Sequence, residues 1–586
     1  MIFIFFLSFA VRLTYLFYLK SHYLFYDFPG SDVDYYQKWA IDLAGGNWLG
    51  KNTFWGLPLY PYFLAISYRS CLGNWEAVRI FHLLLGSLNC VLIYLIARRV
   101  FNPKVAFLSA CFAALSFSLI FYDWLMMPVT LLIFLSLIIL IVLTHAEYLH
   151  SVRDHFLLGL LSGLTILGDG KFLFFSGLIV FWMVFLEVPR RPLAFRKCLS
   201  FVLGVTLIVG GWSLRNKIVH GNWVMISPQS GLSLYIGNNP QATGIFENPG
   251  FIRPTHFGQD EDERIMAETI AKKKMTPAEV SQFWKDQAFS FIKDQPVAYI
   301  KLLGKKIIAF ASENESSYDV DLLLQKELKT RWDLNPWFIL FPVAVIGIVV
   351  SLRSSVSNVY LLLLILSQII TTLIFFLTFR HRTSILPIFL VYEACGVFWI
   401  VDQIYSKRYV RVILSAGAVV LCLCVFGLKK VDAKIIDFIY ETKTALTYDH
   451  QKKYVLAKEH YEKALMLRPD DTNTYYNLGN IYLNQGDYEG ARKYYEIVVK
   501  TCAHHVDARF NLAVVYENLG YDQKAIELFR SVLDLQPQDL TTYYRLGNLY
   551  RSIGNCQESQ FYYGSIISKN SAYRKDLEPF LKKCPE

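Results

Sequence analysis

Long apolar runs recur along the chain as far as about residue 430, and then they stop. A mostly apolar run of about 20 residues can cross a membrane as a helix. About eleven such runs are present: 1–19, 77–97, 104–122, 124–144, 156–168, 172–187, 199–214, 336–352, 357–379, 384–404 and 410–428. Backbone groups inside lipid must be satisfied within their own helix. The sequence therefore predicts an all-α, polytopic transmembrane bundle over residues 1–429.

The composition agrees with a membrane protein and excludes other classes. Hydrophobic residues make up 54% of the 586 residues and charged residues only 18%, against about 45–50% and about 25% in soluble domains. The formal net charge is +10, but no basic stripe lies on a soluble part, so no nucleic-acid partner is predicted. The ten cysteines show no zinc-ligand spacing. No metal site or cofactor is predicted. A divalent cation stays open as an alternative, although no ligand cluster supports it.

Lysine and arginine in the short connections give the expected orientation of the bundle. Basic clusters at residues 98–104, 190–197 and 407–411 fall on one side of an eleven-span bundle, which should be cytoplasmic. The outer side then holds the loops 20–76 and 216–335 together with the C-terminal part. An error of one span would instead place the C-terminal part in the cytoplasm.

The two outer loops contain structure of their own. Residues 57–64 are aromatic and apolar, which suits a helix at the membrane interface. The longer loop begins with a stretch rich in Gly, Asn and Pro, for which a hairpin near residues 222–246 is expected. Helical patterns follow around 260–274 and 277–312.

The C-terminal part, residues 430–586, is an internal repeat. A shift of about 34 residues, the tetratricopeptide (TPR) period, aligns the same residue types over about four repeats. The aligned positions are Ala457, Tyr461, Ala464, Pro469, Tyr475, Leu478, Gly479, Tyr482, Ala491, Tyr495, Leu512, Ala513, Tyr516, Ala525, Phe529, Pro537, Tyr543, Leu546, Gly547 and Tyr550. Stacked repeats of this kind form an α-solenoid with a concave surface for protein partners. The alternative is a stabilising cap or an oligomerisation module.

Two carboxylates stand just after the first span. Asp32 and Asp34 lie two residues apart among aromatic side chains. Partial burial raises the pKa of a carboxylate toward the range of a general base. The alternative is a solvated loop in which Asp34 begins a helix that runs to Leu43.

Further ionisable groups face the same outer side under the predicted topology. They are Asp123, Lys171, Arg215, Arg380 and Arg382. Arginine contacts phosphate in a planar, bidentate way and lysine acts as a point charge. A carboxylate base opposed to several cations at a membrane face suits a lipid-phosphate substrate. The alternative for each cation is an interfacial side chain that reaches toward water.

Two ionisable residues lie inside predicted spans. Arg12 is expected to pair with Asp32 or with another carboxylate, and Glu393 is interpreted as structural. A transporter would need more such groups and broken helices at the midplane, so transport is not predicted.

Several segments, in their order and spacing, resemble the GT-C glycosyltransferases. They are residues 32–40, 45–50, 58–64, 121–123, 212–216, 235–240 and 380–382. The most similar branch is the bacterial one that resembles protein O-mannosyltransferases and lipid A aminoarabinose transferases. The resemblance implies an inverting enzyme that moves a sugar from a polyprenyl-phosphate donor to a hydroxyl of a protein, lipid or glycan. It also implies the periplasmic face of a bacterial inner membrane.

The resemblance also implies roles for individual residues. Asp32 matches the catalytic acid of the first outer loop and would deprotonate the acceptor, with Asp34 in reserve. Asp123 would hold the acceptor or orient a cation. The phosphate of the donor would be bound by Arg215, Arg380, Arg382 and Lys171. Lys171 stands where related chains often carry arginine, and Asp169 beside it weakens the positive field.

An alternative function stays open at this point. The chain could be a non-catalytic membrane anchor whose repeats recruit envelope proteins. In that case Asp32→Asn leaves function intact, whereas an enzyme loses sugar transfer. The partners expected for the enzyme are the lipid-linked donor, an acceptor protein or glycolipid, membrane lipids, and a protein bound to the repeats.

Overall fold

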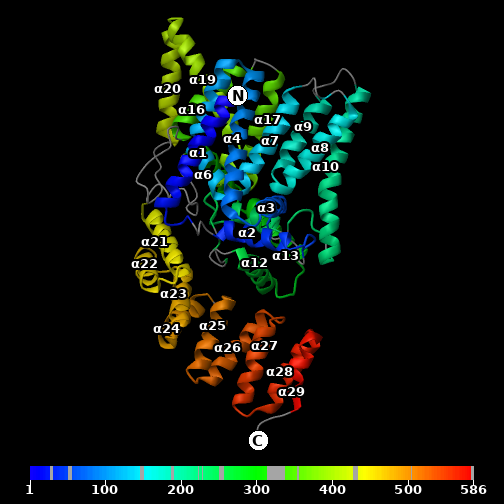
Figure 1. Ribbon diagram of the computed structural model, residues 1–586, viewed down its shortest axis with the longest axis vertical. Coiled ribbons are helices and arrows are strands. Elements are labelled where there is room, and N and C mark those ends of the chain that lie inside the picture. The colour runs from blue at the N-terminus through cyan, green and yellow to red at the C-terminus, as the bar shows by residue number, and fades with distance from the viewer. Residues whose placement is uncertain are drawn as a thin grey trace. The chain divides into compact units, whose positions relative to one another are not determined.

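The computed structural model describes residues 1–26, 31–50, 56–145, 149, 151–185, 191–221, 223–227, 229–247, 249, 252, 256–312, 337–352, 356–426, 433–502 and 504–582. The regular secondary structure of these residues is helical, and their sheet pairing is limited to one isolated parallel bridge between Ile245 and Leu377 (Figure 1). The all-α fold class is therefore confirmed. The expected hairpin near 222–246 was wrong, because Ser230–Gly237 forms helix α11.

The chain divides into two compact units. The first comprises Met1–Pro249, Pro254–Ala267 and Lys272–Asp432, and the second comprises Gly250–Arg253, Glu268–Ala271 and Ala433–Glu586.

The first unit is built from apolar helices, and each predicted span falls on one of them. Five are long and apolar enough to cross a membrane: α1 (Ile2–His22), α4 (Trp75–Val100), α10 (Arg191–His220), α17 (Val356–Ile374) and α19 (Leu386–Tyr405). Shorter apolar helices are α7 (Pro128–Thr144), α9 (Phe172–Phe185), α16 (Trp337–Ser351) and α20 (Tyr409–Phe426). The fifth predicted span falls on α8 (Val152–Gly168). The total of eleven spans remains a prediction.

The third predicted span is broken. It consists of α5 (Pro103–Leu115) and α6 (Phe117–Leu125), which are bent by 52°. Ser116 between them has extended backbone, and Met126 after α6 is left-handed with φ 56°. Pro128 then opens α7 at a position where its missing N–H costs nothing. The polar end of the predicted third span is therefore a helix with its own direction.

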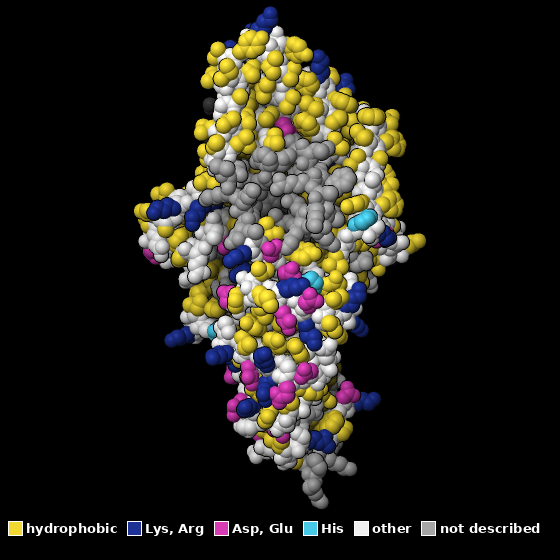
Figure 2. All heavy atoms as spheres, turned by 90° about the vertical axis from the view of Figure 1, so that its left-hand side faces the viewer, with side chains coloured by type: hydrophobic (Ala, Val, Ile, Leu, Met, Phe, Trp, Pro, Cys, Tyr) yellow, Lys and Arg dark blue, Asp and Glu magenta, His cyan; other side chains and the backbone are white. Residues whose placement is uncertain are grey.

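Exposed side chains on the apolar helices are themselves hydrophobic, as expected for helices that face lipid. Examples are Phe3, Phe6, Leu203, Leu207, Ile413 and Leu414. Figure 2 shows wide hydrophobic areas on one face of this unit, and a mixture of acidic and basic side chains on the repeats.

The connections of the first unit carry short helices. These are α2 (Ser31–Ala44), α3 (Leu59–Ser70), α12 (His256–Ala271), α13 (Pro277–Asp294), α14 (Pro296–Ala311) and α18 (Phe379–Thr383). A capping box of Thr276 and Glu279 begins α13. The predicted helix 277–312 is divided at Gln295, because Pro296 lacks an N–H and so begins a new helix.

The second unit forms helix pairs: α21 (Ala433–His450), α22 (Tyr454–Leu467), α23 (Thr472–Asn484), α24 (Tyr488–Thr501), α25 (Val506–Asn518), α26 (Asp522–Leu535), α27 (Leu540–Ser552), α28 (Cys556–Lys569) and α29 (Arg574–Lys582). Aligned positions of the predicted repeat are fully buried, among them Ala457, Tyr461, Leu478, Ala491, Tyr495, Ala525, Phe529 and Leu546. Small residues bring the two helices of a pair together, and the large ones fill the space between them. Cys556 is disulfide-bonded, and eight further cysteines in the described residues are free thiols.

Candidate functional site

Asp32 and Arg380 meet although 348 positions separate them in the sequence. Asp32 lies in the first turn of α2, where the partial positive charge of a helix N-terminus favours a carboxylate. Arg380 lies in the short helix α18, and its Nη1 is 2.9 Å from Oδ2 of Asp32. Both side chains are about one third exposed. The pair is therefore accessible from outside the protein.

Lys171 joins this pair from a third segment, the turn between α8 and α9. Its backbone N–H donates to Oδ1 of Asp169 at 3.1 Å. Its ammonium is buried and finds no hydrogen-bond partner within the part of the chain that the structure describes. Burial lowers the pKa of Lys171 to about 8, although Asp169 raises it, and Arg380 lowers it further. An unsatisfied buried donor of this kind is ready to receive an anion.

Tyr36 and His381 complete the group. Burial raises the pKa of Tyr36 to about 12, and this hydroxyl also interacts with Arg380, Asp32 and Asp169. Burial places the pKa of His381 well below its ordinary value, and the charges of Lys171 and Arg380 lower it further. His381 is therefore neutral. We refer to these six residues as the outer cluster, after the side on which the sequence-based topology predicts Asp32, Lys171 and Arg380: Asp32, Tyr36, Asp169, Lys171, Arg380 and His381.

Sequence reasoning missed Tyr36 and His381 as members of the site. The sequence nevertheless contains a feature that places each of them near the predicted site residues. Tyr36 follows Asp32 by four residues, which places the two side chains on one face of a helix. His381 stands between two arginines that were singled out.

Other predicted residues contact different parts of the molecule. Asp34 pairs with Lys38 at 2.7 Å on the exposed side of α2. Arg382 is buried, and its Nη1 donates to the carbonyl of Ser312 at 2.5 Å while its guanidinium lies 4.7 Å from the centre of the Trp337 ring. These contacts join Arg382 to Ser312 after α14 and to Trp337 at the start of α16.

Arg215 lies near the end of α10. Its guanidinium donates to the carbonyl of Leu49 and to Oδ1 of Asn216, the latter at 3.0 Å. It also lies 5.0 Å from the centre of the Trp212 ring and interacts with Tyr62. These contacts tie Arg215 to the segment around Leu49 and to Tyr62 of α3. Its predicted role in phosphate binding remains a prediction.

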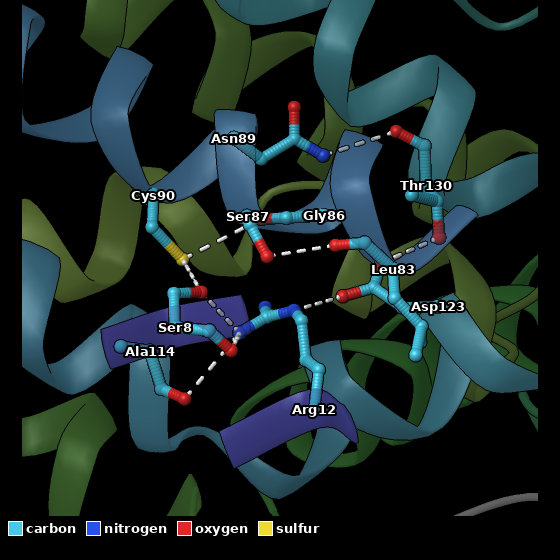
Figure 3. Close-up of polar contacts among 10 residues, drawn as sticks. All are labelled: Ser8, Arg12, Leu83, Gly86, Ser87, Asn89, Cys90, Ala114, Asp123 and Thr130. Atoms are coloured by element: carbon cyan, nitrogen blue, oxygen red, sulfur yellow. Dashed lines mark hydrogen bonds and ion pairs between the residues drawn. The ribbon is translucent and has the colours of Figure 1, made fainter. Parts of the chain in front are cut away.

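Asp123 forms a buried ion pair with Arg12 (Figure 3). Nε of Arg12 is 2.6 Å from Oδ2 of Asp123, and the hydroxyl of Thr130 donates to Oδ1 at 2.8 Å. Nη1 of Arg12 also donates to Oγ of Ser8 at 2.6 Å and to the carbonyl of Ala114 at 3.4 Å. Both carboxylate oxygens of Asp123 are thus used in packing α1 against the broken third span. These contacts favour a structural role over the predicted contact with the acceptor.

Over the described ranges, no group of three or more His, Cys, Asp or Glu could hold a metal ion.

Comparisons with known proteins agree with both parts of the chain. Residues 56–212 match the family model described as dolichyl-phosphate-mannose-protein mannosyltransferase. Residues 448–486 and 476–539 match models described as TPR repeat and tetratricopeptide repeat. The first match contains Asp123, Asp169 and Lys171 and lies between Asp32 and Arg380 in the sequence. The matches support similarity to mannosyltransferase-like, GT-C-like membrane glycosyltransferases over residues 56–212, followed by C-terminal TPR repeats.

Two solved structures with similarity to this chain each cover about 30% of it. The crystal structure of MamA protein is 19% identical, with 30% of this chain and 90% of that chain covered and a TM-score of 0.23. YrrB, described as a TPR protein with an unusual peptide-binding site, is 18% identical, with 31% and 87% covered and a TM-score of 0.23. The comparison with curated proteins gives no match.

Proposed function

We propose that this protein transfers a sugar from a polyprenyl-phosphate-linked donor to an acceptor hydroxyl, with inversion, at the extracytoplasmic face of a bacterial inner membrane. The observation that carries the proposal is the outer cluster. It combines an accessible carboxylate, Asp32, with the guanidinium of Arg380 and the unsatisfied buried ammonium of Lys171. Three segments far apart in the sequence supply these groups.

In the proposed reaction Arg380 and Lys171 bind the phosphate of the donor. The acceptor hydroxyl attacks the anomeric carbon, and its proton passes to the carboxylate of Asp32. The bond from the anomeric carbon to the phosphate oxygen breaks, and polyprenyl phosphate leaves with an additional negative charge. Fixed cations stabilise that charge as it develops. A guanidinium has five N–H groups, so Arg380 can hold Asp32 and a phosphate oxygen together.

The remaining predicted residues take supporting roles in this proposal. Arg215 and Arg382 each rest on a tryptophan ring and a backbone carbonyl, which suits residues that shape the outer loops. Asp34 stays outside the reaction because its carboxylate is paired on the exposed side of α2. The reaction uses no cofactor.

The disulfide at Cys556 supports an extracytoplasmic location for the repeats. Disulfides persist in oxidising compartments and are rare in the cytosol. With the repeats and the outer cluster in the same compartment, a protein acceptor or a protein partner can be recruited by the solenoid. The TPR matches support protein over lipid as the acceptor.

A transfer assay in membranes tests the proposal. Membranes that contain the full-length protein are incubated with a panel of labelled polyprenyl-phosphate sugars. We expect label in a protein or glycolipid product, with an anomeric configuration opposite to that of the donor. Matched membranes without the protein give the background. A non-catalytic scaffold would transfer no sugar from any donor in the panel.

The charge of Lys171 predicts a pH dependence of donor binding. Because its pKa is lowered to about 8, the ammonium is present below pH 8 and is lost as pH rises through that value. A charged hydrogen bond contributes about 1.5–3 kcal/mol, but about a tenth of the ammonium form still remains at pH 9. The donor KM is therefore expected to rise about 5- to 10-fold between pH 7 and pH 9. Lys171→Met should have a high donor KM throughout this range and lose the rise.

The matched control for this measurement is Lys217→Met, which removes an exposed lysine at the end of α10. It should keep the wild-type pH profile. A donor KM that rises equally in the Lys171→Met variant would contradict phosphate binding by Lys171.

A further inference from the structure

The position of Arg380 depends on the short segment between α17 and α18 that directly precedes it. α17 ends at Ile374 and α18, which carries Arg380, begins at Phe379. α18 has only five residues, too few for a helix to be stable by itself. The last carbonyls of α17 also lack partners within the helix. Whatever holds residues 373–378 therefore decides where Arg380 lies.

Lys306 of α14 holds the end of α17 directly. Its Nζ donates to the carbonyl of Leu373 at 2.8 Å and to Oδ1 of Asn238 at 3.0 Å. Asn238 in turn donates through Nδ2 to the carbonyl of Ile374 at 2.7 Å and to that of Leu234 at 2.8 Å. Lys306 and Asn238 are both fully buried. Two carbonyls at the end of α17 are thus satisfied by one linked pair of side chains.

The segment around Asn238 also fixes the chain beyond α17. The N–H of Leu377 donates to the carbonyl of Gly244 at 3.2 Å, and the N–H of Phe246 donates to the carbonyl of Leu377 at 3.0 Å. A Cβ on Gly237 would lie 2.1 Å from the carbonyl oxygen of Phe375, so only glycine permits this approach. These contacts therefore fix the position of the backbone as far as Leu377, three residues before Arg380.

A lysine is energetically unfavourable at this buried position. Burial disfavours its charged form and lowers the pKa of Lys306 to about 7. Both the ammonium and the neutral amine have two N–H groups for the two oxygens, so the contact survives titration. A cation at the C-terminus of α17 also suits the negative end of the helix dipole. An apolar side chain would fill the same space but would leave the carbonyl of Leu373 without this donor.

We propose that Lys306 is a positioning residue: together with Asn238 it clamps the end of α17 and so places Arg380 against Asp32 for donor binding. The proposal rests on the function proposed above. It gives a physical role to the segment 235–240, which the site itself does not use.

Donor kinetics test the positioning role. In membranes with the full-length protein, Lys306→Met is expected to raise the donor KM about 10- to 100-fold, because small displacements of a binding group have effects of that size. The acceptor KM should stay unchanged. Asn238→Ala should have the same selective effect, and combining the two should add little. The control is Lys305→Met, which removes the exposed neighbouring lysine and should behave as wild type.

Hydrogen–deuterium exchange tests the clamp without any substrate. Peptides that cover residues 373–384 should lose protection in Lys306→Met and Asn238→Ala but keep it in Lys305→Met. Unchanged protection there would overturn the proposal, as would a loss of activity that follows only the amount of folded protein. If the wild type transfers sugar from no donor, the proposed function is refuted. The exchange measurement still tests the clamp by Lys306 and Asn238, because it needs no substrate.

Discussion

Asp32→Asn is expected to lower sugar transfer about 10²- to 10⁴-fold, the usual contribution of a positioned general base. The amide has nearly the shape of the carboxylate and still accepts from Nη1 of Arg380, but it cannot take the proton of the acceptor hydroxyl. The variant should therefore lose kcat while binding the donor. Initial rates with a saturating polyprenyl-phosphate sugar, together with binding of polyprenyl phosphate, measure the two effects separately.

Two variants of the same helix sharpen this test. Asp42→Asn changes an exposed carboxylate of α2 whose contact is with Asn47, and it should keep wild-type rates. Asp34→Asn decides between the two acids of the first turn. Loss of transfer in Asp34→Asn, with full activity in Asp32→Asn, would show that the base has been assigned to the wrong residue.

Arg12→Met is expected to destabilise the first unit strongly. The ion pair of Arg12 and Asp123 is almost fully buried, with relative side-chain exposures of 1% and 5%. Removing one member of a buried pair leaves an uncompensated charge and costs about 3–5 kcal/mol. The double variant Arg12→Met/Asp123→Leu removes both charges and should recover much of the loss. Thermal unfolding of the full chain in detergent measures both effects.

Arg98→Met is the control for this series, because Arg98 is exposed near the end of α4. It should leave the unfolding temperature unchanged. If Arg12→Met were as stable as wild type, or if the double variant were less stable than the single one, the ion pair would not have the structural role assigned here. Catalytic loss in a fully stable Asp123→Asn variant would instead support the predicted contact with the acceptor.

A substitution at Gly86 in α4 also tests the packing around the ion pair of Arg12 and Asp123. A Cβ at this position would lie 2.0 Å from Oδ2 of Asp123. Gly86→Ala should therefore displace Asp123 and lower stability by about 1–3 kcal/mol, as overpacking does. Gly177→Ala in α9 meets nothing within 4 Å and should be neutral or stabilising. Equal unfolding temperatures for the two variants would contradict the close packing at Gly86.

The spacing of the predicted site residues limits which of them can belong to one site. Side chains two residues apart in a helix point about 200° away from each other. Asp32 and Asp34 lie in one helix, as do Arg380 and Arg382. One member of each pair therefore joins the outer cluster while the other faces elsewhere. Helical geometry limits each pair to one site residue, but it does not say which one.

What the sequence by itself determined is the part that local pattern encodes. Apolar runs of a given length require helices in lipid, and a period of about 34 residues requires stacked helix pairs. Only the tertiary structure decided which charges meet: Asp32 with Arg380, Arg12 with Asp123, and Lys306 with Asn238 and the end of α17. The physical reason is that hydrophobicity and periodicity act along the chain. Ion pairs between distant helices depend instead on how those helices pack and on which face each of them presents.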